Sequence, residues 1–119
     1  MKLIYVRRYD NRLAISVFHR GHLDFSDVED VDLCDPYQTK MGCHPNGWKI
    51  PEEDSRYEPF VLEDERPLFE AIDTIKEIRD LEEEPINLGI ENRLKELRNK
   101  LEENLTAVKE TIYKNPLSL

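Results

Sequence analysis

Apolar residues recur at helical spacing through the C-terminal half of the chain, and this pattern constrains the fold most strongly. The first apolar stripe comprises Leu68, Ala71, Ile72, Ile75, Ile78 and Leu81, which lie one, three or four residues apart. Pro67 suits the first turn of a helix, and Pro85 stops the pattern. The spacing predicts a helix over about residues 66–84.

A second, longer stripe follows the first after a short linker. It comprises Ile90, Leu94, Leu97, Leu101, Leu105, Val108 and Ile112. Asn87 can cap the start of this helix, and Asn115-Pro116 ends it. The mean step of about 3.7 residues favours a straight helix over a heptad seam. Because the linker around Pro85 is short, we predict an antiparallel hairpin that packs on itself or on a sheet. Pairing with a second copy, to give a homodimer, is the alternative.

The N-terminal third has the composition of β-strands. Residues 3–9 and 13–18 are rich in β-branched and aromatic residues and are separated by a short polar turn. A third strand is expected near residues 23–28, after a two-residue turn at Arg20-Gly21. This turn would place His19 opposite His22, with their β-carbons about 5 Å apart. We therefore predict an N-terminal antiparallel sheet.

The middle of the chain is rich in residues that interrupt regular structure. Five of the seven prolines and two of the four glycines fall between Val31 and Pro67. We expect little regular structure there, and a loop of this length calls for something to organise it. The predicted fold is a single α+β domain over residues 1–119. It has β-hairpins in 1–33, an irregular, metal-organised acidic region in 34–65 and two helices in 66–115.

The candidate organiser is a cluster of metal-ligating residue types. All histidines and cysteines of the chain lie within 26 residues, namely His19, His22, Cys34, Cys43 and His44. Thiolates and imidazoles bind zinc, so four of these five residues are predicted to hold a structural zinc ion. Their spacing matches no standard finger or ribbon. Ordinary buried thiols with surface histidines, or a Cys34–Cys43 disulfide, are the alternatives.

Charge is distributed very unevenly along the chain. The net charge is -9, and residues 22–84 contain twenty acidic and six basic residues. Such a region repels nucleic-acid phosphates and anionic lipids, so we expect a basic protein as partner. The candidate partner-binding residues are Asp24, Asp27, Glu29, Asp30, Asp32, Glu52, Glu53 and Asp54. The sequence lacks the residue pattern of a calcium-binding loop here. Acidic loops that only confer solubility are the other alternative.

Signatures of catalysis are weak in the sequence, although Cys43 and a distant histidine could form a nucleophile pair. There is no phosphate-binding glycine loop and no zinc-deaminase pattern. We therefore expect no enzymatic activity. A zinc-dependent hydrolase with Asp24 as its base is the catalytic alternative. No stretch has the length of a signal-peptide core or a membrane span, so a cytoplasmic protein is expected.

In size, acidity and lack of a catalytic signature, the chain resembles the small phage-borne anti-CRISPR proteins. That resemblance implies the cytoplasm of a host cell and inhibition of guide or target-DNA loading by an RNA-guided nuclease. The sequence therefore predicts a zinc-stabilised acidic protein that inhibits a larger nucleic-acid enzyme by docking carboxylates on its basic surface. A structural or regulatory subunit that assembles through its long C-terminal helix is a further alternative.

Overall fold

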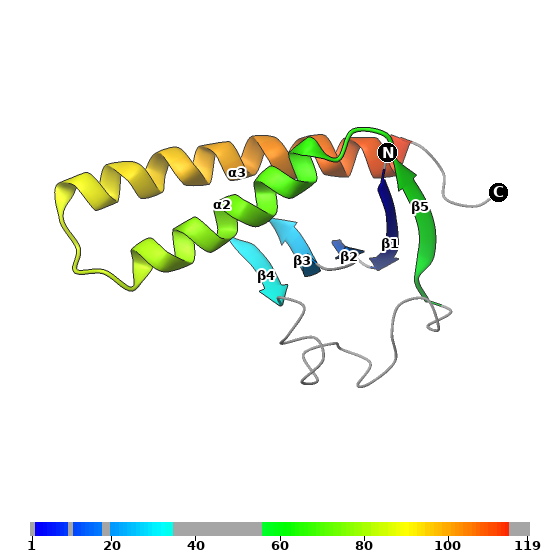
Figure 1. Cartoon of the computed structure of the whole chain (residues 1–119), viewed down its shortest axis with the longest axis horizontal. Helices are drawn as coiled ribbons and strands as arrows, with labels where there is room; N and C mark the ends of the chain where they lie inside the picture. Colours follow the sequence, from blue (N-terminus) through cyan, green and yellow to red (C-terminus); the bar gives the residue numbers. More distant parts are fainter. Residues whose placement is uncertain (1, 10, 18–19, 35–55, 115–119) are drawn as a thin grey trace.

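A five-stranded antiparallel sheet lies against two long helices in the computed structural model of the chain (Figure 1). The structure describes residues 2–9, 11–17, 20–34 and 56–114. The strands are β1 (Lys2–Tyr9), β2 (Arg12–Val17), β3 (Gly21–Asp27), β4 (Asp30–Cys34) and β5 (Glu58–Leu62). The helices are α2 (Arg66–Glu82) and α3 (Leu88–Lys114). The predicted α+β class is confirmed.

The first four strands form a meander, and the fifth returns to the opposite edge. The order across the sheet is β4-β3-β2-β1-β5. β5 pairs antiparallel with β1, so that Lys2 lies opposite Leu62. Our expectation of little regular structure between Val31 and Pro67 is wrong at both ends, because β4 begins at Asp30 and β5 lies within 58–62.

The connection between β2 and β3 differs from the predicted two-residue turn. The Arg20 N–H donates to the Val17 carbonyl at 2.9 Å, and Gly21 follows with a φ of 124°. Only glycine adopts this conformation readily, and it allows a longer loop to rejoin the strand. Val17 therefore pairs with Gly21, and Ser16, not His19, lies opposite His22. His19 itself is outside the described residues.

Both predicted helices are present, and the predicted signals mark their starts. Pro67 lies in the first turn of α2. The Asn87 side chain accepts a hydrogen bond from the Ile90 N–H at 3.0 Å, which satisfies one of the unpaired donors at the start of α3. α2 and α3 pack side by side as an antiparallel hairpin (Figure 1).

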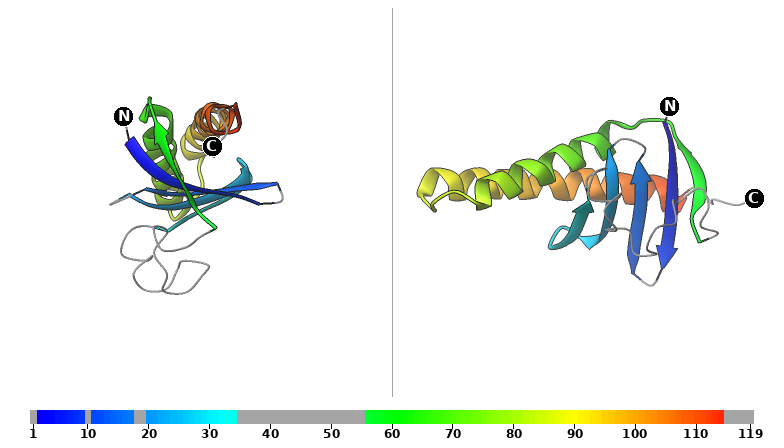
Figure 2. Two further views of the ribbon diagram at one scale, coloured as in Figure 1. Left: turned by 90° about the vertical axis from the view of Figure 1, so that its right-hand side faces the viewer. Right: turned by 60° about the horizontal axis from the view of Figure 1, so that its bottom comes forward.

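The core lies between the hairpin and one face of the sheet (Figure 2). Alternation along each strand turns Ile4, Val6, Leu13, Ile15, Leu23, Phe25 and Leu33 towards the helices. They meet both helical stripes, and Leu97, Leu101, Leu105, Val108 and Ile112 of α3 are all buried. This packing leaves the other face of the sheet to mostly polar residues, together with Ala14 and the exposed pair Leu3 and Val61.

Part of the predicted middle falls outside the described residues. Cys43, His44, Glu52, Glu53 and Asp54 belong to that part. Its organisation by a metal therefore stays a prediction. Among the helices that the structure describes, none is long and apolar enough to cross a membrane.

Candidate functional site

The face of the sheet that points away from the helices carries polar residues in register. One row across the strands contains Ser16, His22 and Cys34, and the next contains Ala14, Asp24 and Asp32. Neighbours in a row are directly opposite each other on antiparallel strands, where β-carbons lie about 5 Å apart. The sheet thus brings together residues that are up to 18 positions apart in the sequence.

His22 is the most buried polar residue of this face. It is 3% exposed and lies beside Tyr57, which is 5% exposed. The His22 Nε2 and the Tyr57 hydroxyl oxygen are 2.7 Å apart and share a hydrogen bond, with the rings edge to face. Buried polar groups of this kind are costly unless paired. Tyr57, just before β5, therefore holds the buried imidazole in a defined position.

Cys34 ends β4 directly opposite His22. Cys34 is disulfide-bonded, and the only other cysteine of the chain, Cys43, lies outside the described residues. The sequence favoured the prediction of a free thiol or a zinc-bound thiolate. For Cys34 the structure shows the alternative, a disulfide. A disulfide sulfur is not a thiolate, so zinc could use Cys34 only after reduction. Among the described residues, His22 and Cys34 are nevertheless the two predicted ligands that lie side by side.

A charged network occupies the end of this face near the β3–β4 turn. Arg12 Nε donates to Asp24 Oδ1 at 2.8 Å, and Arg12 Nη1 donates to Asp30 Oδ2. The hydrogen bond from Arg12, followed by that from Ser26, lowers the pKa of Asp30. The hydrogen bonds that Arg12 donates to Asp30 and then to Asp24 raise the pKa of Arg12. This network links β2, β3 and β4 through charge.

The predicted partner-binding carboxylates have different environments. Asp24 and Asp30 are engaged by Arg12, and Asp27 Oδ1 accepts hydrogen bonds from the backbone N–H groups of Glu29 and Asp30. Glu29 and Asp32 are exposed and form no ion pair with any described residue. Among the described candidates, Glu29 and Asp32 therefore have carboxylates available for an outside partner.

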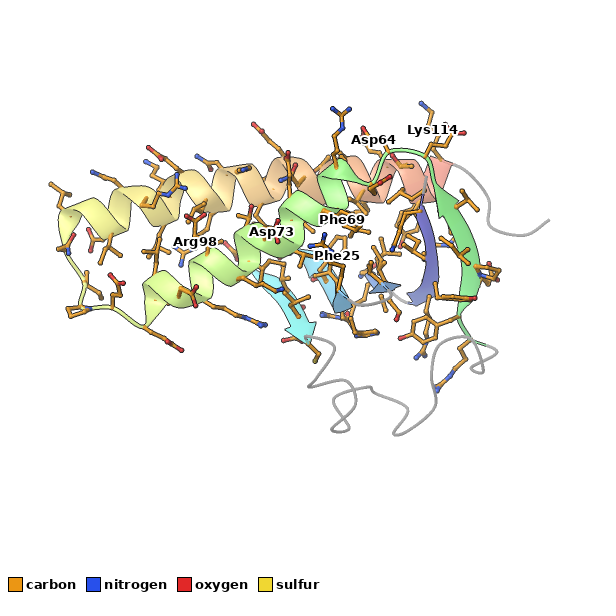
Figure 3. All side chains as sticks on the ribbon, in the orientation of Figure 1. Phe25, Asp64, Phe69, Asp73, Arg98 and Lys114 are labelled. Carbon is orange, nitrogen blue, oxygen red and sulfur yellow. The ribbon has the colours of Figure 1, made fainter. Side chains whose placement is uncertain are left out.

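A second acidic surface lies on α2, and our sequence analysis missed it. Glu70, Asp73, Glu77 and Asp80 follow one another at steps of three and four residues, and all are exposed. Such steps place side chains on one face of a helix, here opposite the buried stripe. We call these four residues the α2 acidic stripe, and Figure 3 labels Asp73 within it. The spacing was visible in the sequence, but we read this segment only for its apolar residues.

Few basic groups neutralise the α2 acidic stripe. Arg93 of α3 donates to Glu77 at 3.1 Å, and this hydrogen bond is the main cause of the raised pKa of Arg93. Arg66, one turn before Glu70, pairs instead with Asp64. Glu70, Asp73 and Asp80 form no ion pair within the part of the chain that the structure describes. The stripe thus presents mostly unneutralised negative charge.

No cluster of three or more histidine, cysteine, aspartate or glutamate residues with the geometry of a metal site occurs among the described residues. Comparison of the chain with protein-family models, with curated proteins and with solved structures finds no match.

Proposed function

We propose that this protein is an acidic binding protein that docks its carboxylates on the basic surface of a larger nucleic-acid enzyme. It thereby prevents that enzyme from binding its substrate. The α2 acidic stripe is the observation that carries the proposal. Its residues span 10 positions, or about 15 Å of helix, with a carboxylate about every 5 Å. A row of this length and sign is suited to a channel that normally binds the phosphates of a nucleic acid.

A rigid helix strengthens this proposal over the alternative of acidic loops that only confer solubility. α2 is fixed by its buried residues Leu68, Ile72 and Ile75, so the carboxylates opposite them keep their spacing. A fixed array loses little conformational freedom on binding and gives directional attraction. The target that we propose, in line with the anti-CRISPR resemblance, is an RNA-guided nuclease whose guide or target DNA would be excluded.

Assembly through the long C-terminal helix is less well supported. The apolar stripe of α3 is already covered by α2 and the sheet, with Leu97 1% and Leu101 3% exposed. A second copy could reach this stripe only if the hairpin opened. A zinc-dependent hydrolase has no support in the described part of the chain beyond the His22 and Cys34 pair.

Zinc binding is a proposal for the reduced protein. With the Cys34 disulfide opened, its thiolate and the opposite His22 imidazole would supply two ligands, and the remaining ligands would come from His19, Cys43 and His44. Elemental mass spectrometry on protein purified with and without reductant tests this. About one zinc per chain only in the reduced sample, lost in Cys34→Ser, is expected; no zinc in either sample would refute it.

The main experiment is a DNA-cleavage assay with a panel of guide-loaded RNA-guided nucleases. The protein is added before or after the target DNA, at low and at high salt. We expect inhibition when it is added first, and weaker inhibition at high salt because the contacts are electrostatic. Absence of inhibition across the panel would overturn the nuclease as target.

A matched pair of variants separates the stripe from net charge. Asp73→Lys/Asp80→Lys reverses two carboxylates of the stripe, while Glu103→Lys/Glu110→Lys makes the same change, at the same spacing, on the exposed face of α3. We expect about a tenfold or greater loss of inhibition for the α2 variant and less than about threefold for the α3 variant. Equal losses would show that only overall charge matters.

A further inference from the structure

The helical hairpin extends well beyond the edge of the sheet at β4 (Figures 1 and 2). α3 has 27 residues and is about 40 Å long, whereas five strands span about 19 Å between the outermost two. The helices run across the strands, and the turn that joins them lies far past β4 (Figure 1). No described strand lies beneath this part of the hairpin, residues 81–94, which we call the projecting segment.

The projecting segment carries apolar side chains that the core does not cover. Leu81 and Leu94 are only partly buried, and Ile86 and Leu88 are 79% and 72% exposed. The apolar residues of the same helices above the sheet are almost fully buried. Exposed apolar side chains gain free energy when a partner removes them from water.

A groove lies between the β3–β4 turn and the underside of the hairpin. It has a volume of about 510 Å³, and Val28, Val31, Ile78 and Leu101 contribute its apolar lining. Arg98, which Figure 3 shows on the hairpin beyond β4, lies at its rim and pairs with Glu82 at 3.3 Å. The groove next to the outer edge of β4 therefore combines an apolar wall with charged side chains, among them Glu29, Arg79 and Glu102.

β4 is an edge strand with hydrogen-bonding capacity left for a partner. Its only described neighbour is β3. The Leu33 carbonyl accepts a hydrogen bond from Arg79 Nη1 at 2.8 Å, so an added strand must displace this side chain to pair with Leu33. Unpaired strand edges of this kind accept an added strand readily.

The charges around the groove and β4 favour a cationic partner. Glu29, Asp32 and Glu102 are exposed and make no ion pair with described residues. Of the two cations that line the groove, Arg98 pairs with Glu82, whereas Arg79 donates to the neutral Leu33 carbonyl and keeps its charge. An approaching lysine or arginine would thus meet carboxylates that no other described group neutralises.

We infer that β4 binds an extended segment of a basic partner as a sixth strand of the sheet. Alternate apolar side chains of that segment enter the groove between Val31 and Ile78, and the intervening lysines or arginines face Asp32 on the opposite side of the sheet. This alternation follows from the geometry of a strand. The inference rests on the proposed function, because it identifies the element by which the basic partner is held.

The test uses a fluorescent synthetic peptide of about nine residues in which valine and lysine alternate, a length typical of a strand. Its binding to the full chain is measured by fluorescence anisotropy, and backbone amide shifts of Val31 and Leu33 are followed by NMR. Two control peptides replace every lysine by glutamate, or two valines by proline. We expect binding of the first peptide only, with shifts centred on β4.

Two matched variants complete the test. Asp32→Lys removes the carboxylate on β4, and Glu110→Lys makes the matched charge change on the exposed face of α3. We expect Asp32→Lys to weaken peptide binding about fivefold or more and Glu110→Lys to leave it within about twofold. Equal binding of the proline peptide, or amide shifts on α2 instead of β4, would overturn the inference. The cleavage assay with Asp73→Lys/Asp80→Lys would still test the proposed function independently.

Discussion

The two faces of the sheet are made by the same strands but are stabilised in different ways. On the helix-covered face, Leu23 and its neighbours are buried among apolar side chains from two helices. On the opposite face, the adjacent residue His22 is buried and is hydrogen-bonded to Tyr57, and Arg12 connects two carboxylates. The covered face depends on apolar area, and the polar face depends on a few directed contacts.

This difference explains where function can change without loss of the fold. Apolar packing is spread over many residues, whereas each polar contact on the other face involves one or two groups. Substitutions on the polar face and on the exposed stripe of α2 should therefore alter binding or local order more than global stability. Four predictions test this difference.

The largest effect is expected from Leu23→Ala on the covered face. Leu23 is completely buried, so truncation leaves a cavity and should lower the free energy of unfolding by about 2–5 kcal/mol. Urea unfolding followed by circular dichroism measures this. A loss below about 1 kcal/mol would mean that the helices do not pack tightly on β3.

Tyr57→Phe on the polar face should cost less, about 1–3 kcal/mol. The substitution keeps the ring but leaves the buried His22 Nε2 without its hydrogen-bond partner. Urea unfolding of Tyr57→Phe, His22→Phe and the double variant provides the measurement. The double variant should lose less stability than the two single variants added together, and full additivity would contradict the contact.

Asn104→Leu should raise stability by about 1 kcal/mol. The Asn104 Nδ2 is buried and is the only buried side-chain polar atom without a hydrogen-bond partner among the described residues. An apolar side chain of similar size removes that cost. Thermal unfolding should show a higher Tm, and a lower Tm would indicate that leucine does not fit between the helices.

The smallest effect concerns pH and the Arg12 network. Hydrogen bonds from Arg12 and then from Ser26 lower the pKa of Asp30 in the folded chain. The stability that these contacts contribute is therefore present above about pH 4, the usual pKa range of an aspartate, and is lost as pH falls through the lower pKa that Asp30 has in the folded chain. Urea unfolding should show wild type and Arg12→Met differing at pH 7 and converging in acid. A difference that persists in acid would contradict this assignment.

The helices and first two strands could be predicted because local signals agreed. Pro67, Asn87 and Pro85 mark helix boundaries, and the apolar steps between them are unbroken. β4 was missed although Asp30 to Leu33 alternate between acidic and apolar residues, because the prolines and glycines after Val31 led us to expect irregular structure. β5 was missed because Pro59 usually disfavours a strand, and only pairing with β1 makes it one.

The polar site was less predictable, for reasons of distance along the chain. His22 and Tyr57 are 35 residues apart, and no local pattern connects them. The expected His19–His22 pair failed because a hairpin loop one residue longer shifts every cross-strand neighbour, and the sequence does not reveal that Gly21 adopts a positive φ. The opposition of His22 and Cys34 could be found only from the register of β3 and β4.

The pairing of β1 with β5 has a consequence for synthesis of the chain on the ribosome. Strands β1 to β4 follow one another and can associate as soon as about the first 34 residues have emerged. The outer edge of β1 must wait for Leu62, and the apolar face of the sheet must wait for the helices that follow. During that interval the nascent sheet exposes both a strand edge and its future core, so we expect this stage to be the most vulnerable to aggregation.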